Sequence, residues 1–428
     1  LYYNIYMQKN RVYYAIDMKT FFASVECAER GLDPFETNLV VADPSRGEGA
    51  ICLAISPKLK SAGIKNRCRL FEIPKNIDYI IAKPQMKKYI EYASEIYGIY
   101  LKYIDKNDIH VYSIDESFID ATDYLKLYKL GAKEFAQKLM REIREILHIP
   151  STAGIGTNLY LAKIALDITA KHSSEFIGLL DENTYKEKLW HHRPITDFWQ
   201  ISKGTEVRLR KHGIYDMYGV AHANEDMLYK EFGINAELLI DHAWGRESCT
   251  IKDIKNYKTK KKSISNMQVL PKNYNFKDSL TVLKEMLQNG CYSLYKHGYV
   301  TNLLHIYIGY GDRSKEFVKG SLRLNVTTNL YSFMEEPITK LYYEITDKTR
   351  EIRRIGIDFC ELHDKGLEQY DIFTDLERVR KEKKLVESVL AIKEKFGKNS
   401  MLKGIDFQEN ATQRERNKLI GGHNSGES

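Results

Sequence analysis

Hydrophobic positions in the first 178 residues alternate between short continuous runs and stripes with helical spacing. The run at residues 12–16 predicts a buried strand that ends at Asp17, and a helix over residues 21–30 follows, with Thr20 as its N-cap. Further strands are predicted at residues 39–42, 50–55 and 152–155, and residues 110–122 predict two short strands that meet at Asp115-Glu116. Further helices are predicted at residues 57–62, 83–103, 131–147 and 158–171, the last N-capped by Thr157. This alternation indicates an α+β or α/β body.

The rest of the chain shows a different pattern. Residues 179–247 hold short helical segments and glycine turns, and residues 195–214 resemble a helix-hairpin-helix with Gly204 at its turn. Residues 255–262 carry five lysines without apolar periodicity, which is typical of a linker. Residues 263–361 alternate strand and helix again and predict a second α+β domain. A charged helix over residues 376–396 and a polar tail follow.

Length and composition narrow the class of protein. At 428 residues, with 43% hydrophobic and 29% charged residues, the chain is expected to form about two to four globular domains. It contains no apolar run of about 18 residues, so no membrane helix is predicted. The opening LYYNIYMQKN lacks the pattern of a signal peptide. The six cysteines show no CxxC pair and no zinc-site spacing, and we therefore expect reduced thiols and a cytoplasmic location.

The charge of the chain is concentrated in one segment. Residues 252–362 hold 19 Lys and Arg against 12 Asp and Glu, a surplus of 7 that equals the net charge of the whole chain. A basic module attached to a neutral body favours a polyanionic partner. On charge alone, a solvated basic face explains the surplus equally well.

Three carboxylates stand where uncompensated charge is unfavourable. Asp17 ends a buried strand, and Asp115 and Glu116 lie within the apolar segment SIDESF. Asp17 by itself is more often a helix cap, and adjacent acids in a hairpin are usually solvated turn residues. Taken together, three such acids predict an oxygen-ligand site for Mg²⁺ or Mn²⁺ rather than zinc. Two such ions are suited to an in-line phosphoryl transfer.

Three sequence blocks carry a family resemblance. YAIDMKTFFASVE (14–26), YSIDESFIDAT (112–122) and AGIGTNLYLAKIALDITAK (153–171) resemble, in order and spacing, the signature blocks of Y-family translesion DNA polymerases, with the bacterial UmuC-like branch most similar. The resemblance covers residues 10–365. It implies a DNA-dependent DNA polymerase of low fidelity that copies damaged templates, and an α+β right-hand fold. The implied parts are a palm (1–27 and 88–178), small fingers (28–87), a helical thumb (179–247), a linker (248–262), a little finger (263–365) and a C-terminal tail (366–428).

The resemblance also implies roles for individual residues in catalysis. Asp17, Asp115 and Glu116 would hold two Mg²⁺ ions, or Mn²⁺, with the backbone carbonyl of Met18 assisting. The residues implied to contact the incoming dNTP are Phe22 as the steric gate against a 2′-hydroxyl, its neighbour Phe21, Ser56, Lys60 and Lys163. Without the resemblance, Phe21 and Phe22 are both expected in the core, and Lys163 is an ordinary helix lysine. Ser56-Pro57 replaces the tyrosine that many members carry near that position, so Ser56 is only a substitute candidate for the triphosphate contact.

Binding residues for DNA and for a protein partner are implied in the second half. Backbone N–H groups at the thumb turn would bind a phosphate of primer-template DNA, and lysines where the linker enters the little finger would add contacts; these candidates are Lys203, Gly204, Thr205, Lys261, Lys262 and Ser263. The segment QYDIF resembles the sliding-clamp-binding peptide of bacterial polymerases, with Gln369, Asp371, Ile372 and Phe373 as its contacts. These partners place the protein at the nucleoid.

Two rival functions stay open at the level of the sequence. Another palm-type phosphoryl transferase, such as a nucleotide cyclase, shares the acid-bearing strands but needs no basic DNA module. A catalytically dead adaptor would bind DNA and clamp only, and the retention of all three carboxylates argues against it. No segment indicates an added exonuclease domain, so proofreading is not expected.

Overall fold

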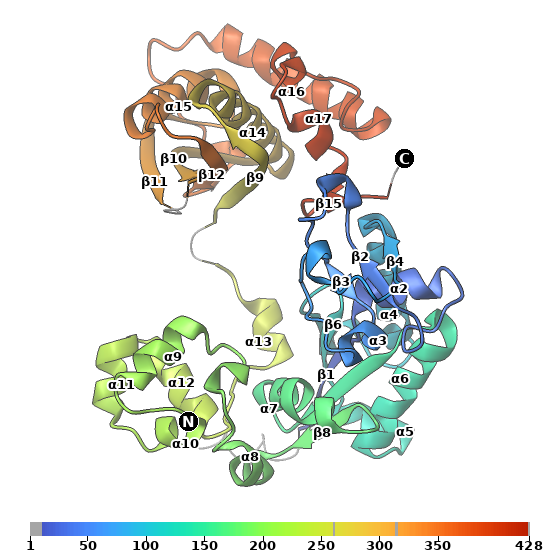
Figure 1. The fold of residues 1–428 in the computed structure, drawn as a ribbon. Helices are drawn as coiled ribbons and strands as arrows, with labels where there is room; N and C mark the ends of the chain where they lie inside the picture. The colour runs from blue at the N-terminus through green and yellow to red at the C-terminus, as the bar shows by residue number, and fades with distance from the viewer. Residues whose placement is uncertain (1–10, 260–261, 313–315, 427–428) are drawn as a thin grey trace. The chain divides into compact units, whose positions relative to one another are not determined.

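The structure is a computed structural model, and it describes residues 11–259, 262–312 and 316–426 (Figure 1). The chain divides into two compact units with the boundary between Tyr257 and Lys258. The last described residues, 424–426, belong to the first unit. Within the described ranges, no helix combines the length and the apolar character needed to cross a membrane.

A five-stranded sheet forms the centre of the first unit, in the order β5-β6-β1-β7-β8. The strands are β1 (Tyr13–Met18), β5 (Ile109–Val111), β6 (Glu116–Asp120), β7 (Ser151–Gly156) and β8 (Ile177–Leu180). β1 pairs antiparallel with both β6 and β7, and β7 pairs parallel with β8. β1 and β7 are buried on both faces, which is why their sequences read as apolar runs without alternation.

Helices cover both faces of this sheet, and side-chain alternation along β1 decides which residue faces which helix. Tyr14 contacts Phe135 of α6 (Ala132–Leu147), whose ring centroid lies 6.1 Å away. Tyr13 and Ala15 instead share a hydrophobic cluster with Ala162 of α7 (Leu159–Ile164). Asp17 therefore lies on the α7 face of the sheet. α4 (Met86–Leu101) packs against α6.

Smaller parts of the first unit flank the sheet. A three-stranded sheet of β3 (Ala54–Ile55), β2 (Leu39–Val41) and β4 (Ile80–Ala82) packs with α2 (Phe21–Ala28) and continues into α3 (Pro57–Ser61). A helical segment follows β8, and it shares a hydrophobic core with α7. Its helices are α8 (Glu182–Leu189), α9 (Lys203–Arg210), α10 (Met217–Ala221), α11 (Glu225–Phe232) and α12 (Asn235–Ala243). α13 (Ile251–Asn256) packs against β5 and β6.

The second unit is an antiparallel sheet whose four long strands follow the order β11-β10-β12-β9, with the short β13 (His363–Asp364) paired to β10 and helices on one face. The strands are β9 (Ile264–Tyr274), β10 (Tyr299–Tyr310), β11 (Phe317–Thr328) and β12 (Ile352–Cys360). The helices are α14 (Phe276–His297) and α15 (Tyr331–Ile345). Figure 1 shows both helices beside the sheet in yellow and orange.

The residues after the second sheet are folded as well. The predicted charged helix is α16 (Leu376–Phe396), and α17 (Gln413–Arg416) packs against α14. Glu285 of α14 is buried, and its carboxylate accepts hydrogen bonds from the backbone N–H groups of Thr412 and Gln413 and from the Thr412 hydroxyl. This part of the chain, which the sequence showed only as a polar tail, is anchored by a buried carboxylate.

Four local predictions need correction. Asn158, not Thr157, is the N-cap of α7, since its side chain accepts a hydrogen bond from the third residue of the helix. Thr20 precedes α2 but makes no side-chain cap hydrogen bond, because its backbone is left-handed. Gly204 lies in the first turn of α9, and Gln200 (φ 71°) supplies the left-handed residue of the turn before it. The helix predicted at residues 83–103 is shorter, Met86–Leu101.

Candidate active site

Two of the three predicted carboxylates lie directly opposite each other. Asp17 on β1 and Glu116 on β6 are cross-strand partners in the antiparallel register. The pair before them, Ala15 and Phe118, belongs to the cluster under α7, so Asp17 and Glu116 point to the same face as that helix. Two like charges directly opposite each other in a sheet are destabilising. The register therefore places a repulsive pair at the end of a buried strand.

Asp115 stands beside this pair at the turn that precedes β6. Its backbone carbonyl accepts a hydrogen bond from the N–H of Met18 at 2.9 Å, so the turn lies against the end of β1. Asp115 is partly buried, and its side chain accepts a hydrogen bond of 2.6 Å from Ser113 Oγ. The turn breaks the strand alternation, which allows consecutive acids to act on one site.

The charges of these acids act on one another. The pKa of Asp17 is raised to about 8, first by burial and then by the negative charges of Asp115 and Glu116, while Lys163 opposes the shift. Burial also raises the pKa of Glu116 above its ordinary value, again against the effect of Lys163. Within the described part of the chain, Glu116 Oε1 is buried without a hydrogen-bond partner. The site thus holds more negative charge than its neighbours neutralise.

The donor chemistry of this site fits a hard divalent cation. Carboxylates and a backbone carbonyl are the ligands that Mg²⁺ and Mn²⁺ prefer, and the partnerless Glu116 oxygen is available to such an ion. As they stand, however, no three or more His, Cys, Asp or Glu side chains of residues 11–259, 262–312 and 316–426 form a group that could hold a metal ion. The other oxygen of Glu116 accepts a hydrogen bond from Lys163.

Lys163 is the main cation next to the carboxylates. It lies on α7, and its Nζ donates to Glu116 Oε2 at 2.8 Å. Burial alone would lower the pKa of Lys163, but the charges of Glu116 and Asp167 raise it above its ordinary value, so the side chain carries its charge. The sequence placed Lys163 near the incoming triphosphate and did not reveal its contact with Glu116, which is 47 residues away.

The two phenylalanines of α2 have different surroundings. Phe21 is buried, whereas Phe22 is partly exposed and stacks on Tyr89 of α4 with ring centroids 4.6 Å apart. The Tyr89 hydroxyl donates to Glu26 Oε1 at 2.6 Å. Glu26 is a fully buried carboxylate one helical turn after Phe22, also bonded to Arg30. Sequence reasoning missed this support of Phe22, although an acid on an apolar helix face was a signal for it.

The predicted phosphate contacts near α3 are only partly accessible. Ser56 is fully buried, and its hydroxyl accepts hydrogen bonds from the N–H groups of Leu39 and Leu59 as the N-cap of α3. That buried cap does not fit a contact with substrate, and the Ser56 assignment is corrected accordingly. Lys60 of α3 is exposed.

A further lysine escaped the sequence analysis. Burial lowers the pKa of Lys19, and the positive charges of Lys60 and Lys171 lower it further, against the charge of Asp17. Its ammonium lies 4.0 Å from the ring centre of Phe176. Lys19, Lys60 and Lys171 come from three segments and are near enough to repel one another. An anion bound among them would relieve this repulsion.

The predicted DNA contacts lie in both units. Ser202 caps α9 and accepts a hydrogen bond from the N–H of Thr205, so Thr205 does not offer this N–H to a phosphate, while Lys203 and Gly204 are exposed. Lys261 lies outside the described residues. Lys262 donates to the Tyr299 hydroxyl at 3.2 Å, and the neighbouring Ser263 is exposed.

The QYDIF segment presents two apolar side chains to solvent. Gln369 is held by backbone hydrogen bonds to Thr327 of β11, and the ring of Tyr370 packs against the core of the second unit. Ile372 and Phe373 are 92% and 88% exposed. Asp371 turns the chain between them and the sheet, since its carboxylate accepts a hydrogen bond from the N–H of Phe373.

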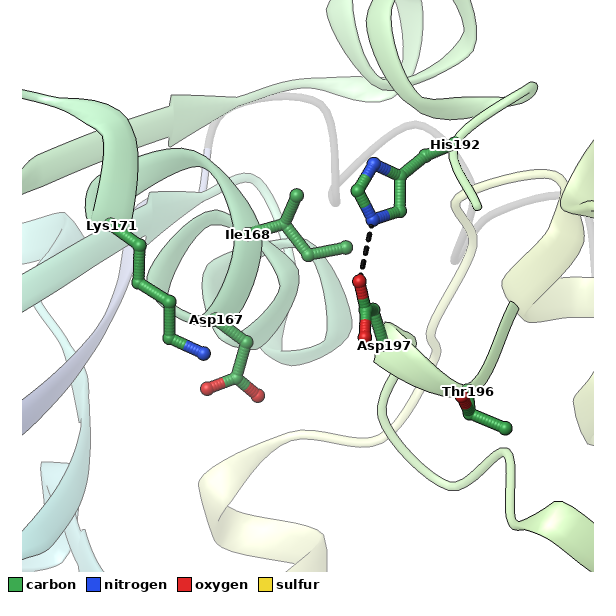
Figure 2. Close-up of a pocket in the computed structure, with 6 residues that line it drawn as sticks. All are labelled: Asp167, Ile168, Lys171, His192, Thr196 and Asp197. Carbon is green, nitrogen blue, oxygen red and sulfur yellow. Dashed lines mark hydrogen bonds and ion pairs between the residues drawn. The ribbon is translucent and has the colours of Figure 1, made fainter. Parts of the chain in front are cut away.

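A polar pocket of about 370 Å³ opens beside the carboxylates. It is lined by Asp167, Ile168, Lys171, His192, Thr196 and Asp197. Figure 2 shows His192 bonded to Asp197, with Nε2 and Oδ2 2.9 Å apart, and Asp167 next to Lys171 on the opposite wall. Asp167 links this pocket to the active site through Lys163.

Comparison with known protein families shows the family to which the chain belongs. The impB/mucB/samB family pattern matches residues 16–167, and the pattern of that family's C-terminal domain matches residues 261–372. The chain belongs to this family of UmuC-like Y-family polymerases. The family prediction is therefore confirmed, and the first matched stretch contains Asp17, Asp115, Glu116 and Lys163.

Individual relatives of this impB/mucB/samB family member cover almost the whole chain. A putative UV-damage repair protein UvrX of Bacillus subtilis is 29% identical over 96% of this chain and 97% of its own length. A DNA polymerase IV 2 of the same organism is 28% identical over 97% of this chain and 100% of its own length. The solved Y-family DNA polymerase chimera Dbh-Dpo4(243-245)-Dbh superposes with a TM-score of 0.63 at 21% identity, over 81% of this chain and 98% of that one. The predicted right-hand polymerase fold is confirmed.

Proposed function

We propose that this Y-family DNA polymerase carries out translesion synthesis at a two-metal site formed by Asp17, Asp115 and Glu116. The observation that carries the proposal is the cross-strand pair of the partly buried Asp17 and the buried Glu116, whose pKa values are raised and whose charge is incompletely neutralised. Such a pair has a physical reason to exist if divalent cations bind there. The names of the relatives, a UV-damage repair protein and a DNA polymerase IV, support the same reaction.

The residues of the site have separate tasks in nucleotide addition. When bound, Mg²⁺ or Mn²⁺ ions supply charge neutralisation for the attacking 3′-hydroxyl and the leaving pyrophosphate of the dNTP. Asp17, Asp115, Glu116 and the Met18 carbonyl would hold them. Lys163 carries a positive charge at the buried end of the site, where the triphosphate needs a partner. Lys60 adds charge from α3.

Phe22 is positioned to select the sugar. Its ring is backed by Tyr89, which is itself held by Glu26, so the ring cannot retreat into the core. A sugar that lies over this ring would have no space for a 2′-hydroxyl. Phe21, which is buried in the core, supports the helix rather than the substrate.

The open face of the second sheet supports DNA binding. Along β11 the side chains from Phe317 to Arg323 alternate, and Lys319 and Arg323 are exposed on the side away from α15. Positive side chains on an open sheet can contact phosphates without reading the base sequence. Lys262 at the start of this unit, and Lys203 and Gly204 at the start of α9, are further backbone contacts for primer-template DNA. At the bacterial chromosome these contacts would place the enzyme in the cytoplasm, at the nucleoid.

The exposed QYDIF segment supports docking to a sliding clamp. Ile372 and Phe373 are almost fully exposed, although two adjacent large apolar side chains are normally buried. Gln369 is pinned to β11, which holds the segment in one place on the second unit. An aliphatic and an aromatic side chain presented together are suited to a hydrophobic pocket on a partner.

Primer extension tests the proposed function. A template with a defined lesion, a primer, dNTPs and Mg²⁺ should yield extended primer past the lesion. Cyclic nucleotide formation without extension would favour the cyclase alternative. DNA binding without any product would favour the adaptor.

A further inference from the structure

The ammonium of Lys163 is shared between two carboxylates on different elements. Its Nζ lies 2.8 Å from Glu116 Oε2 and 3.2 Å from Asp167 Oδ2. The side chains of Lys163 and Glu116 are both 9% exposed, whereas that of Asp167 is 29% exposed. Lys163 therefore has one buried partner in the metal site and one partner at the edge of the polar pocket.

Asp167 lies in an unusual part of its helix. After α7 ends at Ile164, the chain widens into a π-helical turn, η5 (Ala165–Thr169), which contains Asp167. π-turns are rare and occur often at functional sites. The turn is pressed against β7, since a Cβ on Gly154 would lie 2.2 Å from the backbone nitrogen of Leu166. This tight packing fixes Asp167 relative to the sheet.

The shared ion pair creates a conflict at Glu116. A carboxylate that binds a divalent cation through its free oxygen holds a lysine less strongly at the other oxygen, because the cation neutralises the negative charge that both oxygens share. A Lys163 with Glu116 as its only carboxylate partner would resist this exchange. Once released, it would have no carboxylate partner to hold it near the site. Asp167 removes both difficulties, since it can keep Lys163 in place when Glu116 turns away.

We propose that Asp167 is a positioning residue that retains Lys163 beside the incoming triphosphate while Glu116 turns to a divalent cation. This inference rests on the proposed function of the site. A different account treats Asp167 only as a nearby negative charge. That account predicts the opposite effect on nucleotide binding, because removing a negative charge should favour a triphosphate anion.

Steady-state single-nucleotide insertion by the full chain separates the two accounts. Asp167→Asn should raise the KM for dNTP about tenfold with a smaller change in kcat, and Asp167→Glu should restore most of the affinity. Asp197→Asn is the matched control, since Asp197 lines the same pocket but bonds to His192. Its KM should match that of the parent. An unchanged or lower KM for Asp167→Asn would overturn the proposal.

A double-mutant cycle tests whether Asp167 acts through Lys163. In a Lys163→Met background, Asp167→Asn should change the KM by less than about twofold, since the residue it positions is gone. A tenfold effect in that background would show a role independent of Lys163 and contradict the inference. If the parent chain extends no primer, the proposed function fails. If Lys163→Met alone leaves the KM unchanged, the phosphate role of Lys163 fails, and the inference fails with it.

Binding of Mn²⁺ to the DNA-free protein gives a readout without catalysis. Calorimetry should show weaker binding to Asp167→Asn, because Lys163 then pairs with Glu116 alone. Asp167→Asn in the Lys163→Met background should bind Mn²⁺ as well as Lys163→Met does. Weaker binding in that background would mean that Asp167 acts on the cation directly, and the positioning role would be rejected.

Discussion

Asp17 and Glu116 face each other across adjacent antiparallel strands, on the side of the sheet that α7 covers. Burial raises the pKa of both carboxyls, the charge of Glu116 adds to the shift of Asp17, and the opposing charge of Lys163 does not cancel either shift. The strand register therefore creates an unfavourable charge pair at a buried position. The divalent cation that we propose for this site would offset the repulsion.

Cation binding should depend on pH through Asp17. Its pKa is raised from 3.8 to about 8, so the cation-free folded chain holds a proton there that the unfolded chain loses near pH 4. The contribution of this group to folding stability accordingly falls as the pH rises from about 4 to 8. A bound cation must displace that proton, and Mn²⁺ affinity should increase from pH 6 to 8.

Calorimetry in buffers of different ionisation enthalpy measures this proton release. Asp17→Asn should bind Mn²⁺ weakly and release less than about half as many protons at pH 7. Equal proton release from parent and variant would show that another group titrates.

Sugar selection should depend on Phe22. Phe22→Ala removes the ring above Tyr89, and the ratio of ribonucleotide to deoxynucleotide kcat/KM should rise about tenfold to a hundredfold, because a steric barrier is lost. Phe21→Leu is the control, since Phe21 is buried next to it. This control should lower the melting temperature and leave the ratio unchanged. An unchanged ratio in Phe22→Ala would show that Phe22 is not the steric gate.

Stimulation by a sliding clamp should depend on the two exposed side chains of QYDIF. The double substitution of Ile372 and Phe373 to Ala should abolish clamp-stimulated extension and leave distributive synthesis intact. The matched control replaces Leu367 and Leu376, two exposed leucines on either side of the segment, with Ala. Equal stimulation of the two double variants would show that the segment is only a connection.

The placement of α7 should depend on a small residue in β7. A Cβ on Gly154 would lie 2.1 Å from the carbonyl oxygen of Ala162, which is backbone and cannot move aside. Gly154→Ala should therefore lower the free energy of unfolding by about 3 kcal/mol. Gly98→Ala is the control in α4, where no atom lies within 4 Å of the added Cβ. It should raise stability by about 0.5–1 kcal/mol. Urea unfolding measures the stability of both variants. Similar free energies of unfolding for the two would refute the close approach of α7 to Gly154.

The sequence predicted those site residues that stand in short, recognisable sequence patterns. Asp17, Asp115 and Glu116 stand in apolar segments, so their charge was conspicuous in the sequence. Asp167 and Lys19 were not predicted, because a single charged residue on a helix or at a helix start is usually solvated. In the structure they are set apart by the ion pair of Asp167 with Lys163, four residues before it, and by the contact of Lys19 with the distant ring of Phe176.

The other differences between the predictions and the structure have two causes. Some depend on contacts between residues far apart in the sequence, and one depends on neighbouring residues with equal local preferences. Thr157 and Asn158 are both good N-cap residues, and propensity does not decide between neighbours. Ser56 looked like a polar residue near a phosphate site, but its hydroxyl is used by backbone N–H groups. The folded segment after α16 depends on Glu285, which is 127 residues from Thr412 and shows no local signal.

Single-turnover extension of a primer with Mg²⁺ tests the central claim most directly. Asp17→Asn should reduce the rate of nucleotide addition by about a thousandfold or more, since several kcal/mol of charge stabilisation are lost, while DNA binding stays near that of the parent. Asp120→Asn at the other end of β6 is the control and should stay within about threefold of the parent, because Asp120 bonds to Arg11 away from the site. Extension by Asp17→Asn within about tenfold of the parent rate would contradict a metal site at Asp17, Asp115 and Glu116.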